Sequence, residues 1–115
     1  MMKNHVIKFE QTNFVDREDL KVFEYPRFDD TFDIIYAEIN GRHPKNGELV
    51  NNASDETYVV IQGKGQITLD GKRYAVKEKD VVPIKHGTRY FCTGENLKLY
   101  CVITPPWKAD EEDNV

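Results

Sequence analysis

A carboxylate and a phenol two residues apart are the clearest candidates for chemistry in this 115-residue sequence. Glu56 and Tyr58 lie in a run rich in β-branched and aromatic residues, which is typical of a strand. Side chains alternate between the two faces of a strand, so Glu56, Tyr58 and Val60 share one face. If that face is buried without a cation, the pKa of Glu56 rises, and its carboxyl group could act as a general acid or base near neutral pH.

Further candidates lie in predicted loops. Arg42 could bind a carboxylate or phosphate, although pairing with a surface acid is the simpler interpretation. His5 is close to the N-terminus, whereas His43 and His86 lie in turns. Three roles stay open for these two turn histidines: ordinary loop residues, ligands of a metal, or contacts to an anion or substrate.

Tight turns punctuate the stretch around Glu56. Residues 57–61 are predicted as one strand, residues 63–65 as a glycine-containing turn, and residues 66–69 as a second strand. Asp70-Gly71 indicates a hairpin, because a type I′ turn needs positive φ at both central positions. The central stretch therefore reads as three strands joined by two turns.

The N-terminal third is predicted to contain two strands and a helical turn. Residues 5–10 and 31–40 have strand-like apolar residues, and Asp16 could cap a helical turn over residues 16–20. In residues 31–40, the face that carries Tyr36 becomes polar toward its end, as expected if that face opens into a cavity.

The C-terminal part continues with strands. Residues 81–84 form a predicted strand that Pro83 restricts to an edge or a bulge. Residues 89–93 and 97–103 are predicted as a final hairpin across residues 94–96. Eight or more short strands with almost no helix favour an all-β sandwich or barrel.

Length and charge exclude several classes of protein. A chain of 115 residues forms one domain, and a net charge of −4 without a basic strip argues against nucleic acid as a partner. No apolar run reaches the roughly 20 residues of a membrane span, and no apolar signal segment is found, so we expect a cytoplasmic protein. Cys92 and Cys101 are expected to be free, buried thiols.

Two stretches resemble the motifs of the cupins, which are small double-stranded β-helix (jelly-roll) barrels. The first cupin motif ends in Glu, six residues and Gly, and Glu56 and Gly63 match it within DETYVVIQGKG. The second motif is matched in part, within KDVVPIKHG, by Asp80, Val81, Val82 and Gly87. The resemblance covers about residues 41–103 and implies an all-β cupin-type jelly-roll barrel.

The resemblance does not extend to the metal ligands. Metal-binding cupins use two His and a Glu from the first motif and a His from the second. Depending on the register, the His pair falls on Val50 and Asn52 or on Leu49 and Asn51. The last His falls on Tyr90, so Glu56 alone remains of four ligands. A transition metal needs imidazole or thiolate ligands here, and we expect neither a metal nor another cofactor.

A narrower likeness rests on three short features. NGRHP before the barrel, Tyr90 at the last His position and TPPW after the last strand are similar to a group of metal-poor cupins. Some of these are labelled mannose-6-phosphate-isomerase-like. That label rests on the fold, which does not determine the function.

We expect one domain over residues 1–115. The barrel core takes about residues 31–104, residues 1–30 supply an N-terminal strand and a covering segment, and residues 108–115 form a frayed acidic tail. A homodimer is expected as well, because large apolar groups lie outside the predicted barrel strands. These groups are Phe23, Tyr25, Phe28 and Trp107. By resemblance to many cupins, the strand at residues 5–10 could pair with a partner's sheet edge.

The resemblance also implies that Glu56 points into the barrel, and Tyr58 then does so too. The predicted ligand-binding set is Tyr36, Arg42, Asn52, Glu56, Tyr58, His86 and Tyr90. Two interpretations stay open for the centre of this set. It is either a small-molecule pocket or a polar core network in which tyrosine hydroxyls satisfy the carboxylate.

Two functions therefore stay open, and the sequence does not decide whether the protein is an enzyme. The first is a small-molecule-binding cupin without catalysis, with a carbohydrate or an organic acid as ligand. The second is a metal-independent sugar isomerase or epimerase with Glu56 and Tyr90 as acid/base pair, for which metal-free cupin epimerases give the precedent.

Overall fold

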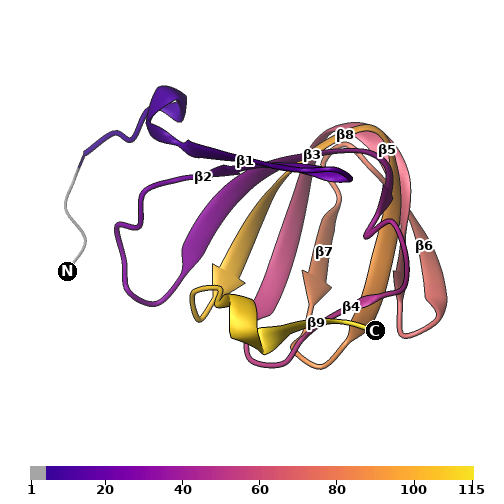
Figure 1. The fold of residues 1–115 in the computed structure, drawn as a ribbon. Helices are drawn as coiled ribbons and strands as arrows, with labels where there is room; N and C mark the ends of the chain where they lie inside the picture. Colours follow the sequence, from indigo (N-terminus) through magenta and orange to yellow (C-terminus); the bar gives the residue numbers. More distant parts are fainter. Residues whose placement is uncertain (1–4) are drawn as a thin grey trace.

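Nine strands form one curled sheet in the computed structural model, which describes residues 5–115 (Figure 1). The strands are β1 (Asn13–Arg17), β2 (Leu20–Glu24), β3 (Asp33–His43), β4 (Leu49–Asn51), β5 (Asp55–Leu69), β6 (Lys72–Lys77), β7 (Val81–Ile84), β8 (Arg89–Thr104) and β9 (Glu112–Asn114). Two short 3-10 helices, η1 (Phe9–Gln11) and η2 (Ala109–Glu111), precede β1 and β9. The pairings are antiparallel throughout, in the order β1-β2-β3-β8-β4-β9, and β5 joins β8 to β6 and β7. The predicted all-β barrel-type fold is thus confirmed.

Two predicted turns are wrong, because the chain continues through them as strand. β5 passes through residues 63–65 and β8 passes through residues 94–96 without reversing. Gly94 lies opposite Gly65 of β5 and Gly41 of β3, so three glycines form a row across three neighbouring strands. A Cβ at Gly65 would collide with the carbonyl oxygen of Thr93. The glycines therefore allow packed strands to bend together, and in Figure 1 β5 and β8 arch over side by side.

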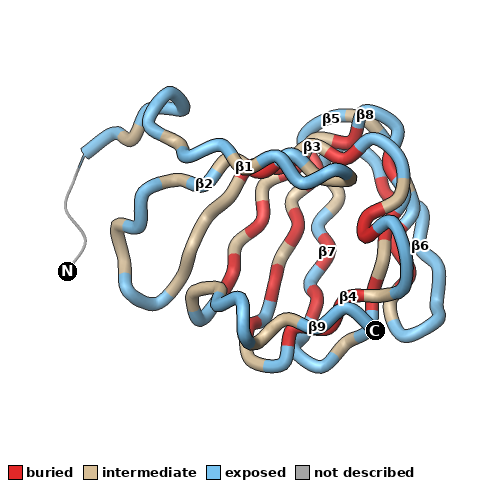
Figure 2. The backbone as a smooth tube through the Cα atoms, viewed as in Figure 1, coloured by how far each residue is buried: buried red, intermediate tan, exposed pale blue. Residues whose placement is uncertain are grey.

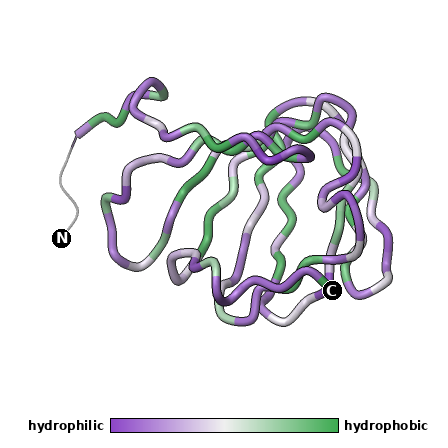
Figure 3. Tube along the Cα trace, viewed as in Figure 1, coloured by the Kyte–Doolittle hydropathy of each residue, from purple (hydrophilic) through white to green (hydrophobic). Residues whose placement is uncertain are grey.

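The concave side of the sheet holds the core. Burial alternates along the strands, including β5 (Figure 2). On β5, Glu56, Tyr58 and Val60 are buried between more exposed neighbours. The apolar side chains of β3 and β8 meet them there, and the hydropathy of the strands alternates accordingly (Figure 3). The Asp70-Gly71 hairpin joins β5 to β6 as predicted, and β7, which contains Pro83, is an edge strand that pairs among residues 5–115 with β5 alone.

The predicted parity of β3 is wrong. Ala37 and Ile39 are buried in the core, whereas the face that carries Tyr36 is the outer face. The polar residues at the end of that face, Glu38 and Asn40, lie toward solvent rather than toward a cavity.

The N-terminal predictions are also corrected. Residues 5–10 form no strand, and Asp16 lies in β1, which pairs with β2 across a two-residue turn instead of starting a helix. The reason is aromatic packing on the outer face. The ring of Phe9 lies 5.1 Å from that of Phe23 and 5.7 Å from that of Tyr36, so the N-terminal segment crosses the sheet instead of extending it.

The acidic tail is ordered by pairing rather than frayed. β9 pairs with β4, and the backbone N–H of Val115 donates to the carbonyl of Glu48. The side chain of Asn52 donates to the backbone of Glu111 and to Asp113. The tail thus closes one end of the sheet.

Two remaining expectations concern cysteines and membranes. Cys92 and Cys101 are both free and buried, as predicted. Among residues 5–115, no helix has the length and apolar character needed to cross a membrane.

We predict that two copies associate through the outer aromatic face. Phe14 on β1 and Phe9 are 50% and 45% exposed, and in the described structure β1 pairs with β2 only, which leaves one edge open. Light scattering should give twice the mass of one chain, and Phe14→Ser should reduce it to a single chain. Tyr74→Ser, at a similarly exposed ring on β6, is the control and should leave the mass unchanged. A wild-type protein with the mass of one chain contradicts this prediction.

Candidate functional site

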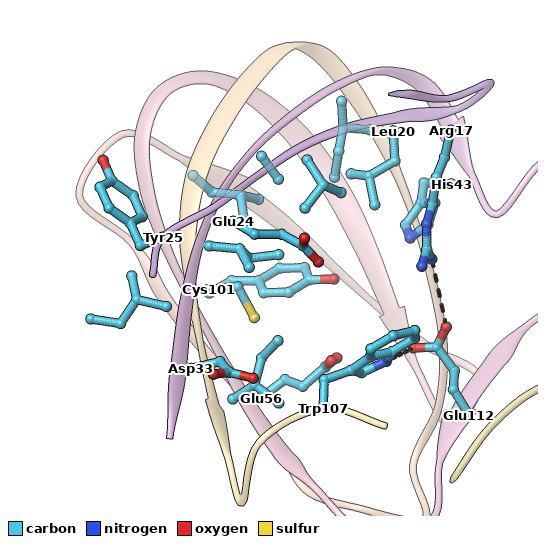
Figure 4. A pocket seen from close by; sticks show the side chains of 18 of the residues that line it. Arg17, Leu20, Glu24, Tyr25, Asp33, His43, Glu56, Cys101, Trp107 and Glu112 are labelled. Atoms are coloured by element: carbon cyan, nitrogen blue, oxygen red, sulfur yellow. Dashed lines mark hydrogen bonds and ion pairs between the residues drawn. The ribbon is translucent and has the colours of Figure 1, made fainter. Parts of the chain in front are cut away.

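A cavity of about 300 Å³ lies on the concave side of the sheet (Figure 4). Its walls come from β2, β3, β5 and β8, and the segment from Trp107 to Glu112 supplies part of its rim. A volume of this size suits a small ring molecule, and the lining combines aliphatic side chains with a few converging polar groups.

Glu56 is the buried carboxyl group of the cavity. It is 6% exposed and accepts a hydrogen bond of 2.8 Å from the hydroxyl of Tyr90. Burial raises the pKa of Glu56 to about 7; the negative charge of Glu112 adds to the rise, and the Tyr90 hydrogen bond opposes it. Glu56 can therefore hold or release a proton at neutral pH.

Tyr58 and Tyr90 complete this part of the cavity. Their rings pack edge to face with 6.5 Å between centroids, and burial raises the pKa of each well above its ordinary value. Both side chains are therefore neutral phenols at neutral pH. The structure brings Glu56, Tyr58 and Tyr90 together inside the barrel, where strand parity and the cupin resemblance predict them.

His43 is a second acid/base group, and the predicted binding set omitted it. It ends β3, is 5% exposed, and its Nδ1 lies 3.0 Å from Oδ2 of Asp19 on the β1–β2 turn. Burial lowers the pKa of His43, and the Asp19 carboxylate opposes that shift. The ring is therefore largely neutral at pH 7. Its alternation with Ala37 and Ile39 along β3 was a signal that could have placed it on the inner face.

A linked group of three side chains forms the rim beside His43 (Figure 4). The indole Nε1 of Trp107 donates to Glu112 over 3.2 Å, and a guanidinium nitrogen of Arg17 lies 3.9 Å from the same carboxylate. The Arg17 guanidinium carbon also lies 5.3 Å from the centre of the Trp107 ring. These residues come from opposite ends of the chain, so no local pattern could have grouped them.

Four predicted site residues lie outside the cavity. Tyr36 is on the outer face and donates to Glu38, and Asn52 binds the C-terminal tail. Arg42 donates to the carbonyl of Pro44 and stacks over an aromatic ring, so it is occupied locally. His86 is exposed, with its Nδ1 2.8 Å from Asp55. Tyr36 and Arg42 lie in β3 and Asn52 and His86 in loops, and none of the four side chains lines the cavity.

The cavity residues do not fit the metal site of metal-binding cupins. Among residues 5–115, no group of three or more His, Cys, Asp or Glu side chains could hold a metal ion. Asn51, at one predicted ligand position, uses its side-chain oxygen to accept the backbone N–H groups of Ala53 and Ser54. Glu56 and Tyr90, at two other ligand positions, offer one carboxyl group and one phenol, which are a poor donor set for a transition metal.

Sequence comparison finds partial relatives. No protein-family model matches the chain. L-ectoine synthase of Wolinella succinogenes is 30% identical over 59 residues, which are 49% of this chain and 45% of that protein. Uncharacterized protein MJ1618 of Methanocaldococcus jannaschii is 29% identical over 63 residues, 52% of this chain and 50% of that protein. The chain thus spans about half the length of the curated relatives it matches.

Solved structures match over nearly the whole chain. Pac13 of Streptomyces superposes with a TM-score of 0.88 at 18% identity, covering 99% of this chain and 92% of that one. Ectoine synthase of P. lautus gives 0.77 at 15% identity, covering 96% and 89%. The cupin domain of Schizosaccharomyces pombe Cnp3 gives 0.69 at 16% identity, covering 84% and 71%. The curled sheet described above is therefore a cupin-like fold.

Proposed function

We propose that the cavity binds a small uncharged hydroxylated molecule, of the nucleoside or sugar class, and catalyses elimination of water from it. The observation that carries the proposal is that one cavity contains two titratable groups whose pKa values are shifted in opposite directions. Glu56 has a pKa of about 7, and burial keeps His43 neutral. Acid/base sites typically contain titratable groups whose surroundings shift their pKa values apart, so that one group acts as the acid and the other as the base.

The charges of the lining support an uncharged ligand. Four carboxyl groups line the cavity, on Glu24, Asp33, Glu56 and Glu112, against the two guanidinium groups of Arg17 and Arg27. Both guanidinium groups already face a carboxylate, Arg27 at 2.7 Å and Arg17 at 3.9 Å. An anionic ligand would lose its hydration beside an excess of negative charge. A carbohydrate or nucleoside therefore suits the cavity better than the organic acid considered from the sequence.

The similarity to Pac13 supports the same class of ligand. That protein is described as a nucleoside dehydratase, and its structures with uridine carry single substitutions of a tyrosine or a histidine. The cavity of this chain is likewise lined by tyrosines and one histidine, and Trp107 offers a planar ring at its rim.

Elimination of water needs a base and an acid on one substrate. The unprotonated Nε2 of His43 takes a proton from carbon, and the electron pair of that bond forms the new double bond. The adjacent C–O bond breaks, and protonated Glu56 gives its proton to the leaving hydroxide, which departs as water. Exchange with solvent then removes the proton from His43 and returns one to Glu56. Tyr90 stabilises the ionised form of Glu56 by its hydrogen bond.

Isomerisation or epimerisation of a sugar, the alternative considered from the sequence, would begin with the same removal of a proton from carbon by His43. The acid/base pair differs from the one expected from the sequence, in which Tyr90 was the partner of Glu56. The Tyr90 hydroxyl is already engaged with Glu56, and burial raises its pKa, so His43 takes the second acid/base role in the proposal.

The test uses uridine and a panel of neutral nucleosides and hexoses. Binding is measured by calorimetry, and a product lighter by one water is sought by mass spectrometry. His43→Gln should lower turnover at least about 100-fold. His86→Gln is the matched control, because it removes an exposed histidine that also faces an aspartate. Binding without any product would instead support a non-enzymatic binding protein, and a panel that neither binds nor reacts would contradict the proposal.

A further inference from the structure

We propose that Asp19 is a positioning residue, which holds the Nδ1–H of His43 and thereby presents the unprotonated Nε2 to the cavity. The inference rests on the proposed function, because it concerns the residue that acts there as the base. It concerns the β1–β2 hairpin, which lies outside both stretches that resemble cupin motifs.

The contact between the two side chains is close and shielded. The 3.0 Å between His43 Nδ1 and Asp19 Oδ2 is a hydrogen-bond distance, and the side chains are 7% and 14% exposed. Asp19 lies on the two-residue turn between β1 and β2, and His43 is the last residue of β3. The short turn thus holds the carboxylate beside the end of β3, where it orients the imidazole.

The hydrogen bond selects one form of the neutral ring. A carboxylate accepts but does not donate, so the proton of neutral His43 must lie on Nδ1. The other nitrogen, Nε2, is left with its lone pair, and His43 lines the cavity. In the opposite form Nε2 would carry the proton and could not take one from a substrate.

The turn that supplies Asp19 is short. Arg17 pairs with Leu20 across it, so Glu18 and Asp19 are its two residues. The same hairpin places Arg17 at the rim of the cavity, close to His43 in Figure 4. The hairpin therefore contributes two side chains to the site. Arg17 faces the cavity, and Asp19 lies behind His43, which acts as the base.

The charges around His43 act in different directions. Asp19 and Glu112 favour its protonated form, whereas Arg17 and burial disfavour it. The facing residue on β8 is Cys92, whose pKa burial raises to about 12, so it is a neutral thiol. Removing Asp19 should lower the pKa of His43 further, because its carboxylate no longer stabilises the protonated ring.

The experiment measures the imidazole directly, using ¹⁵N-labelled histidine and NMR. In the wild type, His43 should carry its proton on Nδ1, and His43→Gln identifies its signals. Asp19→Asn and Asp19→Ala should populate the form protonated on Nε2 and lower the pKa of His43. With a substrate from the panel above, kcat should fall at least tenfold while KM changes less than about twofold, because the base and not the binding surface is altered.

Asp55→Asn is the matched control, since Asp55 forms the same kind of contact with His86 on the exposed surface. It should leave the His43 signals and the turnover unchanged. Circular dichroism checks that both Asp19 variants fold, and either folded variant suffices for the NMR measurement. If His43 keeps its proton on Nδ1 in both variants, the positioning role is wrong, whatever the turnover. If the proton moves to Nε2 and turnover stays unchanged, His43 is not the base, and its orientation by Asp19 has no effect on the reaction.

Discussion

Glu56→Gln should strongly reduce turnover and also make the protein more stable than the wild type at alkaline pH. The amide that replaces the carboxyl group cannot supply a proton to a leaving group, so turnover should fall about 10²- to 10⁴-fold. The amide oxygen can still accept the hydrogen bond that Tyr90 donates to Glu56 in the wild type. The fold should therefore keep its contacts while losing a buried group that ionises.

The stability effect follows from the direction of the Glu56 pKa shift. The carboxyl group loses its proton near pH 4.5 in the unfolded chain and near pH 7 in the folded protein. Between these values the folded state binds more protons, so the free energy of unfolding falls as pH rises through this window. The shift corresponds to a loss of about 3 kcal/mol that is complete above pH 7. Glu56→Gln removes this loss.

Urea unfolding from pH 4 to pH 9 checks the prediction. The variant and the wild type should have similar stability at pH 4, and the variant should be more stable by up to about 3 kcal/mol at pH 8. Glu78→Gln, at an exposed position, controls for the change in net charge. A Glu56→Gln variant that is less stable than the wild type at pH 8 would show that the ionised carboxylate is well solvated or paired.

Gly63→Ala should destabilise the protein far more than Gly71→Ala, although both glycines have the same backbone conformation. Their φ angles are +81° and +82°. An L-residue in this region costs about 1–2 kcal/mol at either position. A Cβ at Gly63 would in addition collide with the carbonyl group of Asn96, whereas a Cβ at Gly71 meets no atom within 4 Å.

The difference between the two variants isolates the close approach of β5 and β8 at the bend. Overpacking against backbone adds about 1–3 kcal/mol, so Gly63→Ala should lose about 2–5 kcal/mol in total. Thermal unfolding of both variants and the wild type measures this directly. Equal losses at the two positions would mean that the strands separate locally without cost, and that the bend is not tightly packed.

Strand parity around Glu56 could be predicted because it depends on local alternation alone. Glu56, Tyr58 and Val60 follow one another on a strand of β-branched and aromatic residues, and one buried member determines the face of the others. The pairing of Glu56 with Tyr90, which is 34 residues away, came from the cupin resemblance and is seen as the 2.8 Å hydrogen bond.

The wrong predictions concern segments whose local sequence is compatible with two different structures. Polar residues at the end of β3 mark either a cavity or solvent, and only the packing of Phe9 and Phe23 on that face decides between them. Glycines at residues 63–65 and 94–96 mark either a turn or a bend. Whether the chain turns or continues as a bent strand depends on which strands pair beside these glycines, and no single segment contains that information.

The missed part of the site depends on distant pairings. Asp19 reaches His43 across 24 positions of the chain, and Arg17 reaches Glu112 only because β9 pairs with β4. An acidic tail is ordinarily read as disordered from its composition. Here its backbone completes the sheet, and Glu112 lines the cavity.

The position of β8 along the chain has a consequence for synthesis. In the described part of the chain β3 pairs with β2 and β8, and β5 pairs with β6, β7 and β8, so β3 and β5 share no neighbour there other than β8. On the ribosome the chain therefore emerges as two separate antiparallel fragments, each with its apolar face open to water. The sheet can close only after residues 89–104 have left the exit tunnel, and such non-local strand pairing is slow. Until then Glu56 has no Tyr90 to pair with, and the exposed apolar faces make the unfinished chain prone to aggregation.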